Sequence, residues 1–362
     1  MVESAYIHIP FCRQKCKYCS FVSFPSLEKI DAYIKALKKQ ILLFYSGNCL
    51  KTLYFGGGTP SLLDCNQINE IVKLFNFNKN AEITIEINPE TVDFEYFKKL
   101  KDTKINRISI GAQSFDDEIL KFIGRKHLSI DIFNAVEYAR ENGFDNISLD
   151  FIYGLPNQTL ESFISDLNTA VKLGIEHISL YGLKIDEECY FAKNPPENIA
   201  DDELQADMYE GAIEILRKNG FEHYEISNFA KNGKYSRHNI NYWQCGEYYG
   251  FGVAAHGFEN GVRYSNTTKL EDFILQPEKK YSEITLSRQE KLEERIFLGL
   301  RLKEGINISK LNKDFNFNFK KEYEVILAKY QKSGHLRIED GHLCLTKKGI
   351  LISNYILADF IN

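Results

Sequence analysis

The sequence has no long apolar segment. None of its 362 residues lies in a run that approaches the roughly 18 consecutive apolar residues of a membrane-spanning helix. The first residues, MVESAYIHIPF, also lack the basic and apolar regions of a secretory signal peptide. These two absences predict a cytoplasmic protein.

The chain also lacks an excess of basic residues. Its formal net charge is -5 and its pI is near 6.0, so its overall electrostatics gives no reason to bind nucleic acid. Because 44% of the residues are hydrophobic and 26% are charged, the composition predicts a folded chain rather than a disordered one. A chain of this length can form one large hydrophobic core and a smaller second domain.

Cysteine is present in a pattern that matters. Cys12, Cys16 and Cys19 follow the spacing C-x3-C-x2-C in FCRQKCKYCSF. Disulfides are rare in the cytoplasm, so clustered cysteines indicate metal or redox chemistry there. The other five are scattered, and we expect them to be structural or surface residues: Cys49, Cys65, Cys189, Cys245 and Cys344.

Three thiolates within one short loop favour an iron–sulfur cluster. A structural zinc ion usually takes two separated C-x2-C pairs or a closing histidine, and neither follows at short spacing, so zinc is the weaker alternative. If three cysteines hold a four-iron cluster, one iron lacks a protein ligand. That iron can accept a small molecule that chelates it through an amine and a carboxylate.

Short β-rich runs alternate with amphipathic helical patterns between residues 4 and 183, which is typical of repeated βα units around a parallel sheet. The predicted strands are Ala5–Ile9, Lys51–Gly56, Glu82–Ile87, Arg107–Gly111, Asn146–Ile152 and His177–Leu183. Helical patterns separate them at Ile30–Tyr45, Gln67–Phe75, Phe94–Leu100, Ile132–Asn142 and Leu160–Leu173. The fold class is therefore α/β, with a barrel or partial barrel of six βα units.

Polar and glycine-rich strings follow the ends of these strands. The cysteine loop follows the first strand, GGGTP the second, NP the third, GAQS the fourth and YGLP the fifth. Because the carboxyl ends of parallel barrel strands meet on one face, these strings predict one shared pocket.

The rest of the chain predicts two further parts. We assign residues 1–220 to the barrel, with a last helix at about 201–219, and residues 221–285 to an aromatic, polar connecting segment. Residues 286–362 contain two helices, a hairpin with the turn EDGH and a final helix, which predicts a C-terminal α+β winged-helix-like domain. Acidic residues interleave with its lysines, so packing or protein contact is favoured over DNA binding.

The cysteine spacing and the GGG loop resemble the radical S-adenosylmethionine (radical SAM) superfamily. In that superfamily S-adenosylmethionine chelates the open iron, and an electron from the cluster can cleave it to a deoxyadenosyl radical. Further strings are similar to one branch, the oxygen-independent coproporphyrinogen III dehydrogenases and their heme-chaperone (HemW-type) relatives. They are YIHIPFC, LYFGGGTPSLL, EINPET, RISIGAQSF, DFIYGLP, YEISNFA and HNINYW, and the likeness extends from residue 4 to the C-terminus.

The resemblance implies a set of residues that contact S-adenosylmethionine: Tyr6, Gly57, Gly58, Thr59 and Glu86. Glycines allow a close approach of the backbone to a ligand, although a plain βα turn is the alternative here, and no Gly-Lys-Ser/Thr follows to make a P-loop. Glu86 stands among apolar neighbours, where a carboxylate needs a partner. The ammonium group of S-adenosylmethionine is a suitable one.

Three more residues match positions that bind a second S-adenosylmethionine in the dehydrogenase branch. They are Gln113, Arg125 and Asp150. Arginine suits a carboxylate, and aspartate suits ribose hydroxyls or an ammonium group. The alternative is a hydrogen-bond network at the top of the barrel.

Two departures from the dehydrogenase pattern favour the heme-chaperone branch. The dehydrogenases carry a fourth cysteine two residues after the third, where this sequence has Phe21, and they carry an N-terminal extension, whereas Met1 lies eleven residues before Cys12. The implied cofactors are a [4Fe-4S] cluster, S-adenosylmethionine and heme. The implied partners are heme-accepting proteins, among them membrane-associated respiratory enzymes, while a homodimer stays open.

The string HNINYW holds the candidate heme ligand, His238. A neutral imidazole can bind iron, and Tyr242 and Trp243 offer aromatic faces to a porphyrin. A satisfied structural histidine is the alternative for His238, and it is the favoured interpretation of His256. The rival functions are an anaerobic coproporphyrinogen III decarboxylase and an interaction protein with a zinc-stabilised loop.

Overall fold

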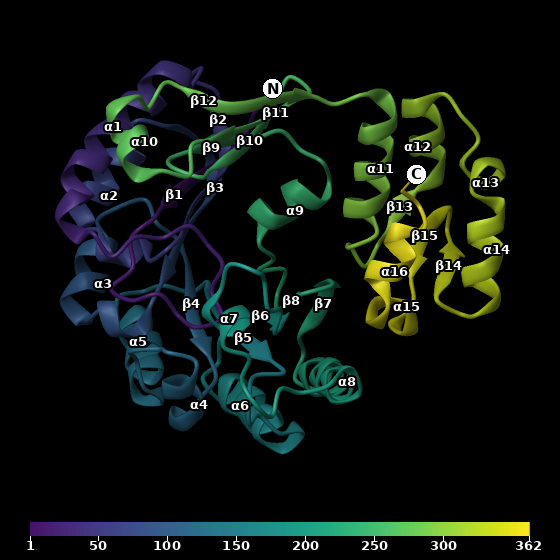
Figure 1. The fold of residues 1–362 in the computed structure, drawn as a ribbon, viewed down its shortest axis with the longest axis horizontal. Coiled ribbons are helices and arrows are strands. Elements are labelled where there is room, and N and C mark those ends of the chain that lie inside the picture. Colours follow the sequence, from purple (N-terminus) through teal and green to yellow (C-terminus); the bar gives the residue numbers. More distant parts are fainter. Residues whose placement is uncertain (362) are drawn as a thin grey trace.

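A sheet of parallel strands forms the centre of the computed structural model, which describes residues 1–361 (Figure 1). Six strands pair in chain order: β1 (Ser4–Ile9), β2 (Cys49–Gly57), β3 (Asn76–Ile87), β4 (Arg107–Gln113), β5 (Ile147–Tyr153) and β6 (His177–Gly182). Each overlaps a predicted strand, although β3 begins at Asn76 rather than Glu82, β5 begins at Ile147 rather than Asn146 and β6 ends at Gly182 rather than Leu183. The predicted partial barrel of six βα units is confirmed.

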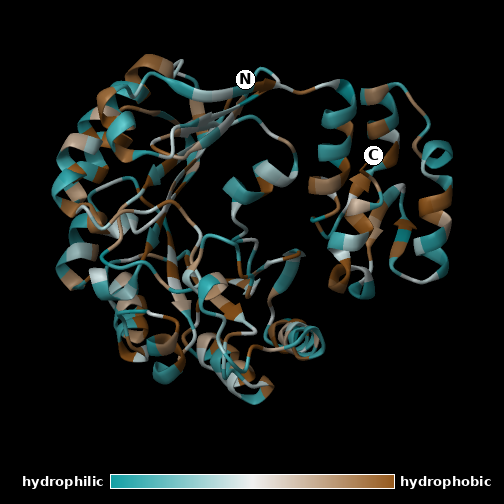
Figure 2. Ribbon diagram, in the orientation of Figure 1, coloured by the Kyte–Doolittle hydropathy of each residue, from teal (hydrophilic) through white to brown (hydrophobic). Residues whose placement is uncertain are grey.

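Helices cover the outside of this sheet (Figure 1). They are α1 (Ile30–Phe44), α2 (Cys65–Val72), α3 (Phe94–Leu100), α4 (Asp117–Phe122), α5 (Ser129–Glu141), α6 (Leu160–Lys172) and α8 (Asp202–Lys218). The chain also forms the short helix α7 (Tyr190–Lys193) and the 3-10 helices η1 (Leu27–Lys29), η2 (Pro60–Leu62) and η3 (Pro89–Thr91). In α1, Tyr33, Leu37 and Ile41 recur every four residues and are buried. That spacing places them on one helix face, against the sheet. Hydrophobic and hydrophilic residues accordingly alternate along the outer helices (Figure 2).

Three further strands extend the sheet beyond the six βα units. β9 (Tyr249–Phe251) pairs with β1 in parallel, while β8 (Asn228–Ala230) pairs with β6 and β7 (Glu222–Glu225) pairs with β8, both antiparallel. Phe251 and Phe273, from the predicted connecting segment, belong to the core of the barrel. Part of that segment therefore packs as barrel structure. Its other elements are α9 (Arg237–Trp243), β10 (His256–Glu259), β11 (Val262–Asn266), α10 (Leu270–Leu275) and β12 (Lys280–Thr285).

The C-terminal part has its own hydrophobic core, centred on Ile296, Phe319 and Ile356. Its elements are α11 (Arg288–Gly299), β13 (Ile306–Asn307), α12 (Ile308–Phe315), α13 (Phe319–Glu322), α14 (Glu324–Lys332), β14 (Leu336–Glu339), β15 (His342–Leu345), α15 (Lys347–Leu351) and α16 (Ser353–Ala358). The two predicted helices and the hairpin are present. The short strand β13 pairs with β15 beside the hairpin, and α12 was not predicted.

The C-terminal domain is tied to the barrel through the β7–β8 turn. Ile226 N–H donates to the Arg301 carbonyl at 3.1 Å, and Lys303 N–H donates to the Tyr224 carbonyl at 3.0 Å. Helix α9 lies between the two parts (Figure 1). No helix among residues 1–361 combines the length and the apolarity that crossing a membrane requires.

Candidate functional site

A cavity of about 430 Å³ opens at the carboxyl ends of the parallel strands. It is lined by all but two of the predicted site residues: Cys12, Cys16, Cys19, Gly57, Gly58, Thr59, Glu86, Gln113, Arg125 and Asp150. Tyr6 and His238 lie outside its lining. The shared pocket expected from the strand ends is therefore present.

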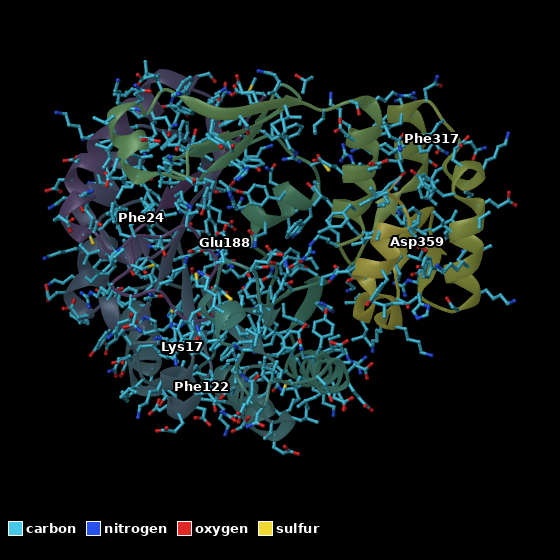
Figure 3. All side chains as sticks on the ribbon, in the orientation of Figure 1. Lys17, Phe24, Phe122, Glu188, Phe317 and Asp359 are labelled. Carbon is cyan, nitrogen blue, oxygen red and sulfur yellow. The ribbon has the colours of Figure 1, made fainter. Side chains whose placement is uncertain are left out.

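The cysteine loop follows β1 and is anchored at both ends. Cys12 N–H donates to the Phe24 carbonyl at 3.1 Å, and Lys17 N–H donates to the Ile123 carbonyl at 3.0 Å. The Lys17 ammonium lies 5.0 Å from the centre of the Phe122 ring (Figure 3) and 5.9 Å from that of Tyr190. These contacts hold the loop against α4 and α7 with its thiols toward the cavity.

The three thiols are free and each faces a distinct environment. Burial raises the pKa of Cys12 and raises that of Cys19 to about 11, so a thiolate there needs positive charge nearby. The Thr59 hydroxyl donates to Cys12 Sγ at 3.4 Å, and Arg125 Nη1 donates to Cys16 Sγ at 3.7 Å. Hydrogen bonds from such donors and binding to metal cations would both stabilise the thiolate form of these cysteines.

Within residues 1–361, no group of three or more His, Cys, Asp or Glu side chains surrounds one point where a single metal ion could bind. An iron–sulfur cluster does not require its cysteine ligands to converge on one point, because each cysteine binds a different iron atom. Three thiols on one loop, each lining the same cavity, fit the donor set of an iron–sulfur cluster.

The glycine loop after β2 packs tightly under the cysteine loop. Gly57 has φ +112°, and a Cβ there would lie 2.5 Å from His8 Cε1. A Cβ on Gly58 would lie 2.7 Å from the Phe11 carbonyl oxygen. Because real Cβ atoms do not come so close to other atoms, both positions require glycine for packing, and the backbone then borders the cavity directly.

Glu86 is one of the acidic residues that line the cavity. Its carboxylate accepts hydrogen bonds from the Tyr54 hydroxyl at 2.8 Å and from Gly57 N–H at 3.1 Å. Burial, with a smaller contribution from the charge of Asp150, raises the pKa of Glu86 to about 7. A ligand ammonium would favour the charged carboxylate. Tyr6 lies behind this group, where its ring stacks on Tyr54.

Arg125 and Asp150 are held in place by protein groups as well as facing the cavity. Asp150 accepts from Ser109 Oγ at 2.8 Å and Ser148 Oγ at 3.1 Å, and burial raises its pKa. Arg125 Nη2 donates to the Gly111 carbonyl at 2.9 Å. Both the binding role and the network alternative are thus compatible with their positions. Gln113 lines the cavity and adopts φ +66°, a backbone conformation that is uncommon for a residue other than glycine.

His238 is buried and has both ring nitrogens in hydrogen bonds. Nδ1 lies 2.8 Å from Thr52 Oγ1, and Nε2 lies 2.7 Å from the Tyr242 hydroxyl. Its ring stacks on Tyr54 with the centroids 5.1 Å apart. Burial lowers the pKa of His238 to about 3, so the ring is neutral. In this arrangement neither nitrogen is open to an iron atom.

Sequence reasoning gave no role to several cavity residues. Tyr54, Ser109 and Tyr181 line the cavity, and their place on β2, β4 and β6 makes them lumen-facing. Asn88 also lines it, at the point where β3 ends. The string NP marked that strand end, which was the available signal for Asn88.

Comparisons with known proteins agree with this geometry. Residues 6–170 match the Radical SAM superfamily model, and residues 286–352 match the HemN C-terminal domain. The chain is 36% identical to "Heme chaperone HemW" of Lactococcus lactis, covering 99% of this chain and 97% of that protein. It is 35% identical to the Bacillus subtilis protein of the same name, covering 99% of each.

One solved structure is similar over nearly the whole chain. It is the coproporphyrinogen III oxidase HemN of Escherichia coli, a radical SAM enzyme, with a TM-score of 0.88 and 25% identity, covering 99% of this chain and 90% of that one. The relatives that are more than a third identical from end to end carry the heme-chaperone name instead. This chain therefore belongs to the HemW heme-chaperone family of the radical SAM superfamily.

Proposed function

We propose that the protein is a cytoplasmic heme chaperone that binds a [4Fe-4S] cluster, S-adenosylmethionine and heme, and delivers heme to acceptor proteins. The observation that carries this proposal is the cavity, which is lined by three free thiols, the glycine loop and the carboxylate of Glu86. Relatives of the same length are named heme chaperones, and that supports the direction of the activity.

In this proposal Cys12, Cys16 and Cys19 would hold the cluster and leave one iron without a protein ligand, which the amine and carboxylate of S-adenosylmethionine could chelate. The bound cluster supplies an electron and a coordination site. Glu86 pairs with the ligand ammonium, because a buried carboxylate of raised pKa gains most from a cation. Asp150, oriented by two serine hydroxyls, would accept hydrogen bonds from ribose hydroxyls or an ammonium group of a second S-adenosylmethionine.

Heme ligation by His238 stays a prediction. The ring would first have to release Thr52 or Tyr242. The test is a heme titration of His238→Ala beside His238→Gln, since glutamine keeps a polar amide near both partners but does not ligate heme iron. We expect both variants to retain the cluster and to bind heme more weakly. Unchanged heme affinity in both would place the ligand elsewhere.

Anaerobic coproporphyrinogen III oxidative decarboxylation is the second candidate, favoured by the TM-score of 0.88 to HemN. Phe21 speaks against it, because it lines the cavity, 66% exposed, where the dehydrogenases resembled by this sequence have a cysteine. The deciding experiment uses one anaerobically reconstituted sample for both a heme titration and a product assay. Tight heme binding without turnover supports the chaperone, whereas formation of protoporphyrinogen from coproporphyrinogen with dithionite and S-adenosylmethionine refutes it.

A further inference from the structure

Asn88 connects two of the three predicted cluster ligands. Its amide nitrogen donates to Thr59 Oγ1 at 3.0 Å, and its amide oxygen accepts from Arg125 Nη2 at 2.9 Å. Thr59 in turn contacts Cys12 Sγ at 3.4 Å, and Arg125 contacts Cys16 Sγ at 3.7 Å. Asn88 thus contacts two of the groups that donate to thiol sulfur, while Ser23 also bonds to Cys12 and Tyr18 to Cys16.

The direction of every hydrogen bond in this network is fixed by Arg125. A guanidinium has only donors, so the atom of Asn88 that faces it must be the oxygen. The nitrogen of Asn88 is then left facing Thr59, whose hydroxyl oxygen must accept. Because a hydroxyl carries one hydrogen, that hydrogen points to Cys12 Sγ.

The other side of Arg125 is equally determined. Its Nε donates to His127 Nδ1 at 3.3 Å, so that nitrogen is an acceptor and Nε2 donates to the Ala112 carbonyl at 3.1 Å. The guanidinium is therefore oriented independently of any ligand in the cavity.

The backbone of Asn88 is also fixed. Its N–H donates to Ser61 Oγ at 3.2 Å, and its carbonyl accepts from Thr91 Oγ1 at 2.7 Å. An amide held at its main chain and at both side-chain atoms does not rotate freely. The fixed amide of Asn88 therefore orients the side chains of Thr59 and Arg125.

We propose that Asn88 is a positioning residue that directs hydrogen bonds onto the sulfurs of Cys12 and Cys16 and thereby raises the reduction potential of the bound cluster. This inference rests on the cluster ligation proposed above. Hydrogen bonds to cluster sulfur stabilise the reduced, more negative state, so their number and direction set the potential. Asn88 acts on the cluster through Thr59 and Arg125 and does not contact the sulfurs itself.

The test is a potentiometric titration of the reconstituted protein without S-adenosylmethionine, followed by absorbance and electron paramagnetic resonance. Thr59→Val removes the hydroxyl at constant shape, and we expect the ratio of reduced to oxidised cluster at a fixed potential to fall about tenfold, which is about 59 mV for one electron. Thr59→Ser keeps the hydroxyl and should restore the wild-type value. Ser20→Ala is the matched loop control, since Ser20 Oγ donates to Asp186 Oδ2 at 2.8 Å and to no sulfur.

Asn88→Asp tests the positioning step itself. A carboxylate still accepts from Arg125 but cannot donate to Thr59, so the hydroxyl turns away from Cys12 and the potential falls. In a Thr59→Val background the same change has no hydroxyl to redirect, and we expect a smaller shift, caused by the added charge alone. Equal shifts in both backgrounds would mean that Asn88 does not act through Thr59.

The outcomes separate this inference from the proposed function. Wild-type protein that takes up no iron or sulfide refutes the cluster ligation. A full cluster whose potential is the same in wild type, Thr59→Val and Asn88→Asp refutes the positioning role alone. If Thr59→Val fails to hold the cluster, Asn88→Asp decides by itself, since an unshifted potential there overturns the inference.

Discussion

Replacing His238 by alanine should destabilise the barrel strongly at neutral pH. The change removes two hydrogen bonds, at 2.8 Å to Thr52 and 2.7 Å to Tyr242, and the stacking on Tyr54. Each partner left unsatisfied in the interior costs about 1–3 kcal/mol, and the lost ring contact adds about 0.5–1.5 kcal/mol. We expect the free energy of unfolding of the apoprotein to fall by about 3–5 kcal/mol at pH 7.5.

Acid should shrink this difference between wild type and variant. The pKa of His238 is lowered to about 3 in the folded chain, whereas an unfolded histidine titrates near 6.5. Below pH 6.5 the unfolded state gains a proton that the folded state does not, so the contribution of His238 is complete above pH 6.5 and is lost as the pH falls toward 3. At pH 5.0 the loss is about 2 kcal/mol, from 1.5 pH units at about 1.36 kcal/mol each.

Urea unfolding of both proteins at pH 7.5 and pH 5.0, followed by circular dichroism, measures the two effects. The exposed His256 provides the control variant His256→Ala, which should change stability by less than about 0.5 kcal/mol at both pH values. A His238→Ala effect below about 1 kcal/mol, or one that grows on acidification, would refute the assignment of a buried neutral ring with two hydrogen bonds.

Three further outcomes are expected. Alanine at any cysteine of the C-x3-C-x2-C motif should abolish iron and sulfide uptake, measured by elemental analysis and cluster absorbance. The control Cys49→Ala, at an exposed position, should not change this uptake. Full clusters in all three motif variants would contradict the ligand assignment. Because the pKa of Glu86 is about 7, the affinity for S-adenosylmethionine, measured calorimetrically, should weaken as the pH falls from 8 to 6. Glu86→Gln should bind S-adenosylmethionine weakly and without this pH dependence. A steep pH dependence in the variant would assign the titration to another group. Gly57→Ala should prevent cluster assembly because its Cβ would clash with His8. Gly174→Ala, at φ +69° with open space around its Cβ, should lower the stability measured by thermal unfolding by only about 1 kcal/mol. Equal cluster content and equal stability in the two variants would contradict the steric argument.

Much of the barrel could be predicted because its signals are local. A parallel strand buried on both faces is a short apolar run, and the six such runs all became strands. The added strands β7, β8 and β9 carry only three or four residues each. The pairing of β8 with β6 and of β9 with β1 depends on contacts between residues far apart in the chain, which no local pattern encodes, and β7 joins the sheet only through β8.

The candidate site shows the same division. Cysteine spacing identified three thiols and the strand-end strings identified one pocket, because βα repeats bring strand ends together whatever the side chains are. Sequence could not show that both nitrogens of His238 are occupied, since Thr52 lies far from it in the chain. Apart from the string NP at the end of a strand, it also gave no reason to single out Asn88.

By itself, the amino-acid sequence determined the order of strands and helices and the sulfur donors near the first strand, since both follow from residue type and spacing. Only the tertiary structure decided which polar groups meet across the barrel and in which direction they donate. The physical reason is that a hydrogen bond between distant residues depends on the packed positions of both, and Arg125, having only donors, fixes the direction of the network around Asn88 once packing brings them together.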